Sequence, residues 1–194
     1  MEEKHNITRD QHFQESECQF TFSKEWEVIQ YDAHDYYKTV SGKSFSGVDF
    51  AGIFRDTLYL IEVKNYYQYN QTGEIEELEN FCVEMKEKFL DTIDLIRIIQ
   101  KYHNRKWSYR LFYRLVKSYP NLYHTWWFWT RMYQIIENDK VEFVLLIDSL
   151  ETRESIKLKT VELMVEEYNT DFDLQVLPIT TSDIPDLEII HHIT

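Results

Sequence analysis

Three charged residues interrupt an apolar stretch of the chain at positions where a protein core would place Val or Leu. The stretch covers residues 47–66, and the three are Asp49, Glu62 and Lys64. Carboxylate oxygens are the ligands that Mg²⁺ and Mn²⁺ prefer, and charged residues that break an apolar pattern often mark function. An ammonium group beside such a cation can hold a cation-bound water or balance the charge of a phosphate. These residue types therefore indicate metal-assisted hydrolysis of a phosphodiester.

The spacing of these residues predicts a hairpin that brings the two carboxylates together. If Arg55 and Asp56 form a two-residue turn, the flanking strands are antiparallel. The register then places Asp49 opposite Glu62, with Cβ atoms about 5 Å apart on one face of the sheet. Lys64 shares that face because strand side chains alternate. Two carboxylates this close repel each other unless a cation lies between them.

The arrangement of Asp49, twelve intervening residues and then Glu62-Val63-Lys64 resembles the active-site motif of the PD-(D/E)xK nuclease superfamily. The resemblance implies the restriction-endonuclease-like fold and a magnesium-dependent nuclease. It implies that Asp49, Glu62 and the backbone carbonyl of Val63 bind Mg²⁺ or Mn²⁺. It also implies that Lys64 assists the attacking water. The residue before Asp49 is Val48, where the family pattern has Pro.

The bare pattern of an acid, any residue and Lys also occurs elsewhere in this acidic chain, so its context decides. It recurs at Glu2-Glu3-Lys4 and at Glu84-Met85-Lys86, which stands in a helical stretch. Only Glu62 ends a run of strand-forming residues and follows an aspartate on an earlier apolar strand. An ion pair between Lys64 and the two acids is the structural alternative. A catalytically inactive nuclease-fold module that binds nucleic acid or a partner protein is the functional alternative.

The elements around the motif predict an α/β fold: a restriction-endonuclease-like core with a mixed central β-sheet, flanked by helices. A chain of 194 residues is expected to form a single domain over 1–194. Strands are predicted at residues 26–31, 141–147 and 174–177, and the last of these is expected to end the sheet. Residues 34–40 fit a short helical turn or a second strand.

A long helix is predicted after the motif. Apolar residues recur at three- and four-residue steps between Leu78 and Ile99, which indicates an amphipathic helix of about 25 residues. Lys86 and Lys88 lie on this helix. The resemblance implies that a basic residue of this helix points at the active site, but spacing alone does not separate these lysines from a solvated face.

Two further segments carry expectations. Residues 1–17 are polar and acidic and are expected to form a mobile arm or a short helix. Residues 105–137 are rich in aromatic and basic residues and are expected to form a helical insertion. The aromatic residues suit a core, a dimer interface or base stacking, and the basic ones suit phosphate contacts. The candidate nucleic-acid-binding residues are Lys43, Arg105, Lys106, Arg110, Arg114 and Lys117.

The charge of the chain is uneven. The net charge is −13, which argues against a polyanionic partner, yet residues 95–136 hold eight Lys and Arg and no acidic residue. A local basic surface is enough for nucleic acid, so we expect nucleic acid as the partner, with DNA ahead of RNA. The resemblance implies a homodimer or a larger restriction, repair or defence assembly.

The expected compartment follows from the cysteines and from hydropathy. Cys18 and Cys82 have no metal-ligand spacing and are expected to be thiols, which suits a reducing compartment. The first residues lack a signal-peptide pattern, and no stretch of about 18 apolar residues exists to cross a membrane. The sequence therefore predicts a cytoplasmic protein with no membrane partner.

Overall fold

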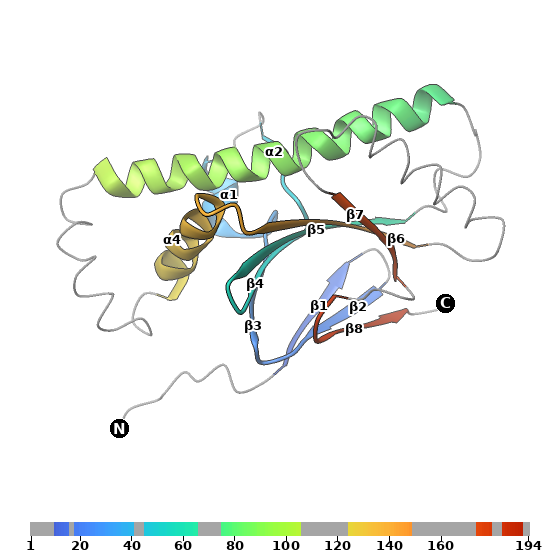
Figure 1. The fold of residues 1–194 in the computed structure, drawn as a ribbon, viewed down its shortest axis with the longest axis horizontal. Helices are drawn as coiled ribbons and strands as arrows, with labels where there is room; N and C mark the ends of the chain where they lie inside the picture. Colours follow the sequence, from blue (N-terminus) through green and yellow to red (C-terminus); the bar gives the residue numbers. More distant parts are fainter. Residues whose placement is uncertain are drawn as a thin grey trace.

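The structure is a computed structural model that describes residues 10–15, 18–40, 45–65, 75–105, 124–148, 174–179 and 184–191. Within these ranges the chain forms two β-sheets and three helices (Figure 1). The class is therefore α/β, as the sequence predicts. No helix in these ranges has both the length and the apolar character needed to cross a membrane.

The larger sheet is mixed and has five strands in the order β3-β4-β5-β6-β7. Its strands β3, β4 and β5 are antiparallel neighbours, whereas β5, β6 and β7 run parallel. A parallel neighbour requires a long crossover connection, and helices α2 and α4 lie in the chain between β5 and β6. The strand bounds are Trp26–Gln30 for β3, Phe50–Phe54 for β4, Thr57–Asn65 for β5, Val141–Asp148 for β6 and Leu174–Pro178 for β7.

The hairpin of β4 and β5 has the register that the sequence predicts. Arg55 and Asp56 form the turn, and Arg55 has a φ of 57°, in the left-handed region. The ladder runs from Phe54↔Thr57 to Phe50↔Ile61. It ends one residue before the predicted Asp49–Glu62 pair, because Asp49 lies in a bend.

Three helices cover one face of this sheet (Figure 1). They are α1 (Asp35–Val40), α2 (Ile75–Arg105) and α4 (His124–Ile136). The helix alternative for residues 34–40 is thus the observed one, and α2, with 31 residues, is the predicted long helix. Phe89 of α2 and Trp129 of α4 pack with Leu60 of β5 in one buried cluster. The described Trp residues of α4 therefore belong largely to the core; Trp127 is half-buried.

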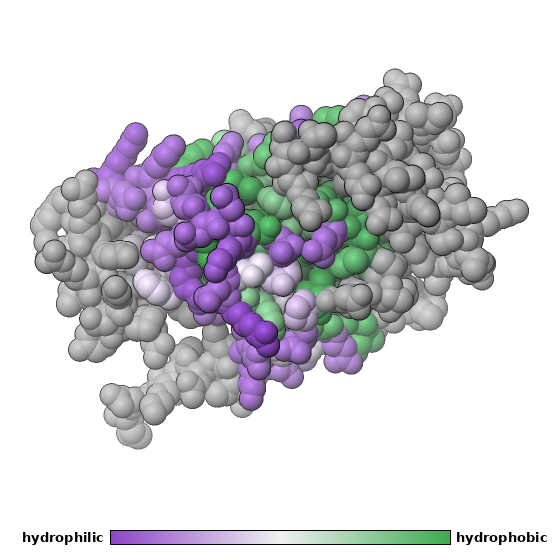
Figure 2. All heavy atoms as spheres, viewed as in Figure 1, coloured by the Kyte–Doolittle hydropathy of each residue, from purple (hydrophilic) through white to green (hydrophobic). Residues whose placement is uncertain are grey.

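A polar contact ties α4 to the hairpin. Arg131 of α4 forms an ion pair with Glu27 of β3, and its Nη2 donates to the Arg55 carbonyl at 3.2 Å. Figure 2 shows hydrophilic side chains gathered over α4 and the β4–β5 turn, with apolar side chains in view toward the middle of the same face. The positive-φ turn is thus fixed from outside by an arginine.

A second sheet of three antiparallel strands lies against the other face (Figure 1). Its order is β1-β2-β8, with bounds Gln11–Glu15, Cys18–Phe22 and Leu187–His191. Phe20 and Phe22 of β2 join Val63 and Val144 of the larger sheet in a second buried cluster. The larger sheet is therefore buried on both faces, which explains why every residue of β4 is buried.

This small sheet corrects two expectations. Residues 11–15 form strand β1 and not an arm or a helix, because alternate side chains such as Phe13 pack against the core. The strand at 174–178 is not the last one, because the tail pairs as β8 with β2, Cys18 opposite His191. The single domain over 1–194 stays a prediction. Cys18 and Cys82 are buried in different clusters and form no disulfide with each other.

Candidate active site

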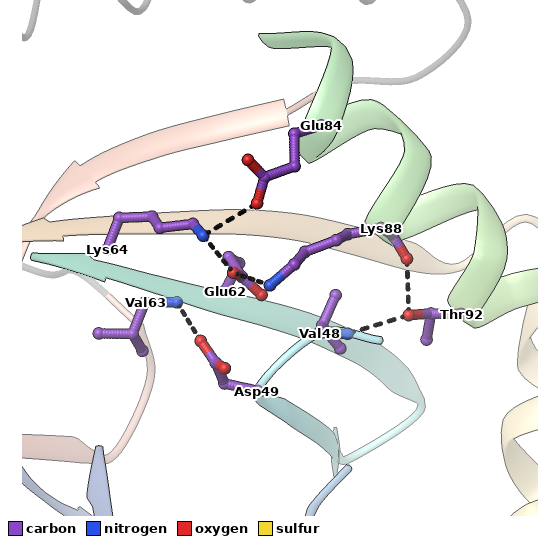
Figure 3. A network of polar contacts seen from close by, with 8 residues as sticks. All are labelled: Val48, Asp49, Glu62, Val63, Lys64, Glu84, Lys88 and Thr92. Atoms are coloured by element: carbon purple, nitrogen blue, oxygen red, sulfur yellow. Dashed lines mark hydrogen bonds and ion pairs between the residues drawn. The ribbon is translucent and has the colours of Figure 1, made fainter. Parts of the chain in front are cut away.

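Glu62 is the centre of the candidate site. It lies on β5 with its side chain turned toward α2 (Figure 3), and only 1% of it is exposed. Its Oε1 accepts a hydrogen bond from Lys88 Nζ at 2.5 Å and forms an ion pair with Lys64 Nζ at 3.3 Å. Its Oε2 has no hydrogen-bond partner among the described residues. A buried carboxylate oxygen left without a partner costs free energy, so a ligand at Oε2 would stabilise the protein.

Asp49 lies beside Glu62 but is oriented differently from the prediction. Its Oδ2 accepts a hydrogen bond from the backbone N–H of Val63 at 2.7 Å, as Figure 3 shows. Burial, and then the charge of Glu62, raise the pKa of Asp49 to about 8, although the Val63 N–H opposes the shift. The two acids therefore interact electrostatically, as predicted. The Val63 N–H, however, donates to the carboxylate of Asp49 and not to the backbone carbonyl of a paired strand residue.

Burial also raises the pKa of Glu62, and the ammonium groups of Lys88 and Lys64 oppose that rise. Two ammonium groups beside one oxygen favour the ionised form of a carboxylate and so oppose the effect of burial. The site is thus built from two buried acids whose charges repel and two lysines that partly compensate them.

Lys64 lies between two carboxylates. Its Nζ is 3.3 Å from Glu62 Oε1 and 3.3 Å from Glu84 Oε1. Burial by itself lowers the pKa of Lys64, but Glu62 and Glu84 more than offset this and raise it. Lys64 is therefore an ammonium ion at neutral pH. This favours the role of an electrostatic stabiliser over that of a general base.

Lys88 is a site residue that the sequence did not select. It stands one turn after Glu84 on α2, and the neighbouring apolar positions Met85 and Phe89 are buried against the sheet. That packing turns Lys88 toward β5. The resemblance pointed to a basic residue of this helix without choosing one, and the phase of the apolar positions places Lys88 beside the buried face of the helix.

The residues present fit a magnesium ion. The unpartnered Oε2 of Glu62, the second carboxylate oxygen of Asp49 and the carbonyl of Val63 are hard oxygen donors of the kind that Mg²⁺ binds. The described residues contain no group of three His, Cys, Asp or Glu side chains that could hold a metal. Two carboxylates and a carbonyl would leave the remaining positions to water and substrate oxygens, as is usual for Mg²⁺.

Of the six predicted nucleic-acid-binding residues, only Arg105 lies in the described part of the chain, and it lies away from this site. Arg105 is exposed at the end of α2, about 25 Å along the helix from Lys88. The other five predicted contact residues lie outside the described residues: Lys43, Lys106, Arg110, Arg114 and Lys117.

Comparison of the chain with protein-family models, with curated proteins and with solved structures finds no match.

Proposed function

We propose that this protein is a magnesium-dependent nuclease with a restriction-endonuclease-like core, and that it hydrolyses phosphodiester bonds of DNA. The observation that carries the proposal is the buried Glu62. One of its oxygens receives two ammonium groups, and the other has no partner among the described residues. Asp49 lies close enough for its pKa to be raised by that charge. Buried polar atoms without a hydrogen-bond partner are uncommon in native proteins, so this half-satisfied acid supports a ligand-binding role.

Asp49, Glu62 and the Val63 carbonyl would hold the metal. Mg²⁺ bound there supplies positive charge to a phosphoryl oxygen and lowers the pKa of a bound water. Lys64 and Lys88 converge on one carboxylate oxygen, so both ammonium groups lie beside the proposed metal ligand Glu62 and would stabilise negative charge on a phosphate bound there. Lys64 stays charged because Glu62 and Glu84 raise its pKa. The protein groups thus favour the charge of the transition state.

One observation favours a second function. The 2.5 Å contact between Lys88 and Glu62 already compensates the carboxylate without a metal. An inactive module that binds nucleic acid or a partner protein would keep such an ion pair. We regard the inactive binding module as the alternative function, and the cleavage experiment below distinguishes it from the nuclease.

The proposal extends to partner and compartment. We place the protein in the cytoplasm as a DNA-binding homodimer or a component of a larger defence or repair assembly. Two buried cysteines that are not joined to each other support a reducing compartment. The run of eight basic residues between Asp94 and Glu137 supports a polyanionic partner.

The testing experiment measures cleavage of single- and double-stranded DNA and RNA with Mg²⁺, with Mn²⁺ and with EDTA. The variants are Asp49→Asn and Lys64→Met, with Glu87→Gln and Lys140→Met as matched controls. Glu87 and Lys140 are exposed and lie outside the site. We expect metal-dependent cleavage by the wild type. Each site variant should lower kcat by about a hundredfold or more. Asp49→Asn removes a metal ligand, and Lys64→Met removes an ammonium group that stabilises the transition state.

The outcomes divide cleanly if circular dichroism shows that all variants are folded. No cleavage by the wild type, with Mn²⁺ binding that Asp49→Asn does not weaken, would reject the nuclease and support the binding module. Cleavage that survives both site variants would show that the activity comes from another site. Cleavage of RNA alone would correct the assigned substrate.

A further inference from the structure

Helix α2 reaches both acids of the site through two side chains that are one turn apart. Lys88 holds Glu62 directly. Thr92, four residues later, is completely buried and lies on the same side of the helix (Figure 3). The hydrogen bonds of Thr92 lead to the backbone on both sides of Asp49.

The first path runs through the hydroxyl of Thr92. Oγ1 donates to the carbonyl of Lys88 at 2.8 Å and accepts the N–H of Val48 at 3.2 Å. A buried threonine in a helix can satisfy its hydroxyl with the i−4 carbonyl alone. The second contact therefore does more than satisfy Thr92, because it fixes the Gly47–Val48 peptide, one peptide before the one that leads into Asp49.

The second path runs through the backbone carbonyl of Thr92. That carbonyl accepts a hydrogen bond from the phenol of Tyr31 at 3.3 Å, and the backbone N–H of Tyr31 donates to the Asp49 carbonyl at 2.8 Å. Burial raises the pKa of Tyr31 well above its usual value, so the phenol keeps its proton. The Gly47–Val48 peptide before Asp49 and the peptide after Asp49 are thus both connected to one residue of α2.

Close packing prevents this segment from shifting independently. A Cβ added at Gly47 would lie 2.7 Å from the Tyr37 ring and 3.0 Å from the Tyr31 ring. The backbone that leads to Asp49 therefore lies directly on Tyr31, which is itself bonded to Thr92. Asp49 has no ladder pair of its own on β5, so these backbone contacts act together with the Val63 N–H to place its carboxylate.

We propose that Thr92 is a positioning residue that sets the place of the Asp49 carboxylate relative to Glu62. The inference rests on the proposed function, since the position matters for a metal held by both acids. A shift of a metal ligand by a fraction of an ångström is enough to weaken binding, and partners of metal ligands typically change affinity or activity by about 10- to 100-fold.

The test compares Thr92→Val, which removes the hydroxyl at nearly constant volume, with Thr92→Ser, which keeps it. Asp91→Ala is the control. Asp91 accepts the N–H of Ser46 at 2.8 Å, so it contacts the same segment at a point three residues before Asp49. Amide hydrogen exchange of Val63 reports the Asp49 carboxylate directly, because that N–H donates to Asp49 Oδ2. Mn²⁺ affinity and the kcat and KM of cleavage are measured beside it.

We expect Thr92→Val to speed exchange at Val63 about tenfold, to weaken Mn²⁺ binding by about 10- to 100-fold and to lower kcat more than it changes KM. Thr92→Ser keeps the hydroxyl and should leave the exchange rate, the Mn²⁺ affinity and the kinetic constants close to those of the wild type. Asp91→Ala should alter none of these three readouts. Unchanged exchange at Val63 and unchanged Mn²⁺ affinity in a folded Thr92→Val protein would overturn the proposal.

If Thr92→Val does not fold, Tyr31→Phe tests the second path alone and should shift the same readouts less; no shift would overturn the proposal. The exchange and Mn²⁺ measurements do not depend on turnover. If the wild type does not cleave nucleic acid but Thr92→Val still changes exchange at Val63 and Mn²⁺ affinity as expected, the positioning role of Thr92 is supported and the nuclease is rejected.

Discussion

At the scale of single residues, Asp49 is expected to destabilise the metal-free protein as pH rises. Its pKa is about 8 in the folded protein, whereas the ordinary value of an aspartate is 3.8. Between these values the unfolded state binds fewer protons, so the free energy of unfolding falls from about pH 4 to about pH 8. Asp49→Asn removes this dependence and keeps an acceptor for the Val63 N–H. We expect the variant to be more stable at pH 8 by a few kcal/mol, because one pKa unit is about 1.4 kcal/mol.

The measurement is urea unfolding at pH 4, 6 and 8 in EDTA. The two proteins should differ little at pH 4 and most at pH 8. Added Mg²⁺ should then stabilise the wild type at pH 8 and leave Asp49→Asn unchanged, because a ligand that binds only the folded state raises its stability. A variant that is less stable than the wild type by the same amount at every pH would contradict the raised pKa.

The sequence could select Asp49, Glu62 and Lys64 as candidate site residues because their charge contradicts the apolar strands around them. It could not choose Lys88 or find Thr92. Their roles depend on which face of α2 lies on β5 and on the distance between them, and side-chain contacts between a helix and a sheet have no local signature. The orientation of Asp49 was missed for a related reason, since the bend that ends the ladder one residue early lies beside Val48, whose N–H donates to Thr92 on the distant helix α2.

At the scale of elements, Gly52 allows β3 and β4 to pair around a buried tryptophan. A Cβ at this position would lie 2.9 Å from two atoms of the Trp26 ring. That ring is fully buried and contacts the rings of Phe54 and Tyr59, with centroids 5.1 and 5.0 Å away. Gly52→Ala should therefore lower the free energy of unfolding by about 1–3 kcal/mol, the usual range for overpacking. Chemical unfolding monitored by fluorescence measures the change.

A double-mutant cycle shows whether the Trp26 ring is the cause. Trp26→Phe removes the ring atoms that the methyl group introduced by Gly52→Ala would meet, so the double variant should lose less stability than the sum of the single losses. Simple additivity would show that the cost of Gly52→Ala arises elsewhere, for example from the backbone.

Elements with a strong local pattern were predicted correctly, and elements formed by distant pairing were not. The β4–β5 register follows from the turn and from apolar strands on either side of it. Strand β1 has five residues with one large apolar side chain, and β8 pairs with β2 across most of the chain length. Such short strands become recognisable only when their partner is known, because their stability comes from the sheet.

At the scale of the whole molecule, some basic residues of the segment between Asp94 and Glu137 already form ion pairs with acidic residues of the protein. Arg97 lies 3.6 Å from Asp94 and 3.5 Å from Glu137, and Arg131 is paired with Glu27. Two of the eight basic residues between Asp94 and Glu137 therefore have acidic partners within the protein. Their contribution to phosphate binding should be small, in spite of their place in the basic run.

We accordingly predict different salt dependences for two sets of variants. The triple change Arg110→Gln, Arg114→Gln, Lys117→Gln should weaken binding to duplex DNA and reduce the slope of log K against log salt by about 3, since each phosphate contact contributes about 0.9. Arg97→Gln, the matched control from the same basic run, should leave the slope unchanged. Fluorescence anisotropy at several salt concentrations measures both in EDTA, which prevents cleavage. Equal slopes for the wild type and the triple variant would remove these residues from the nucleic-acid interface, and a smaller slope for Arg97→Gln would show that its acidic partners release it when DNA binds.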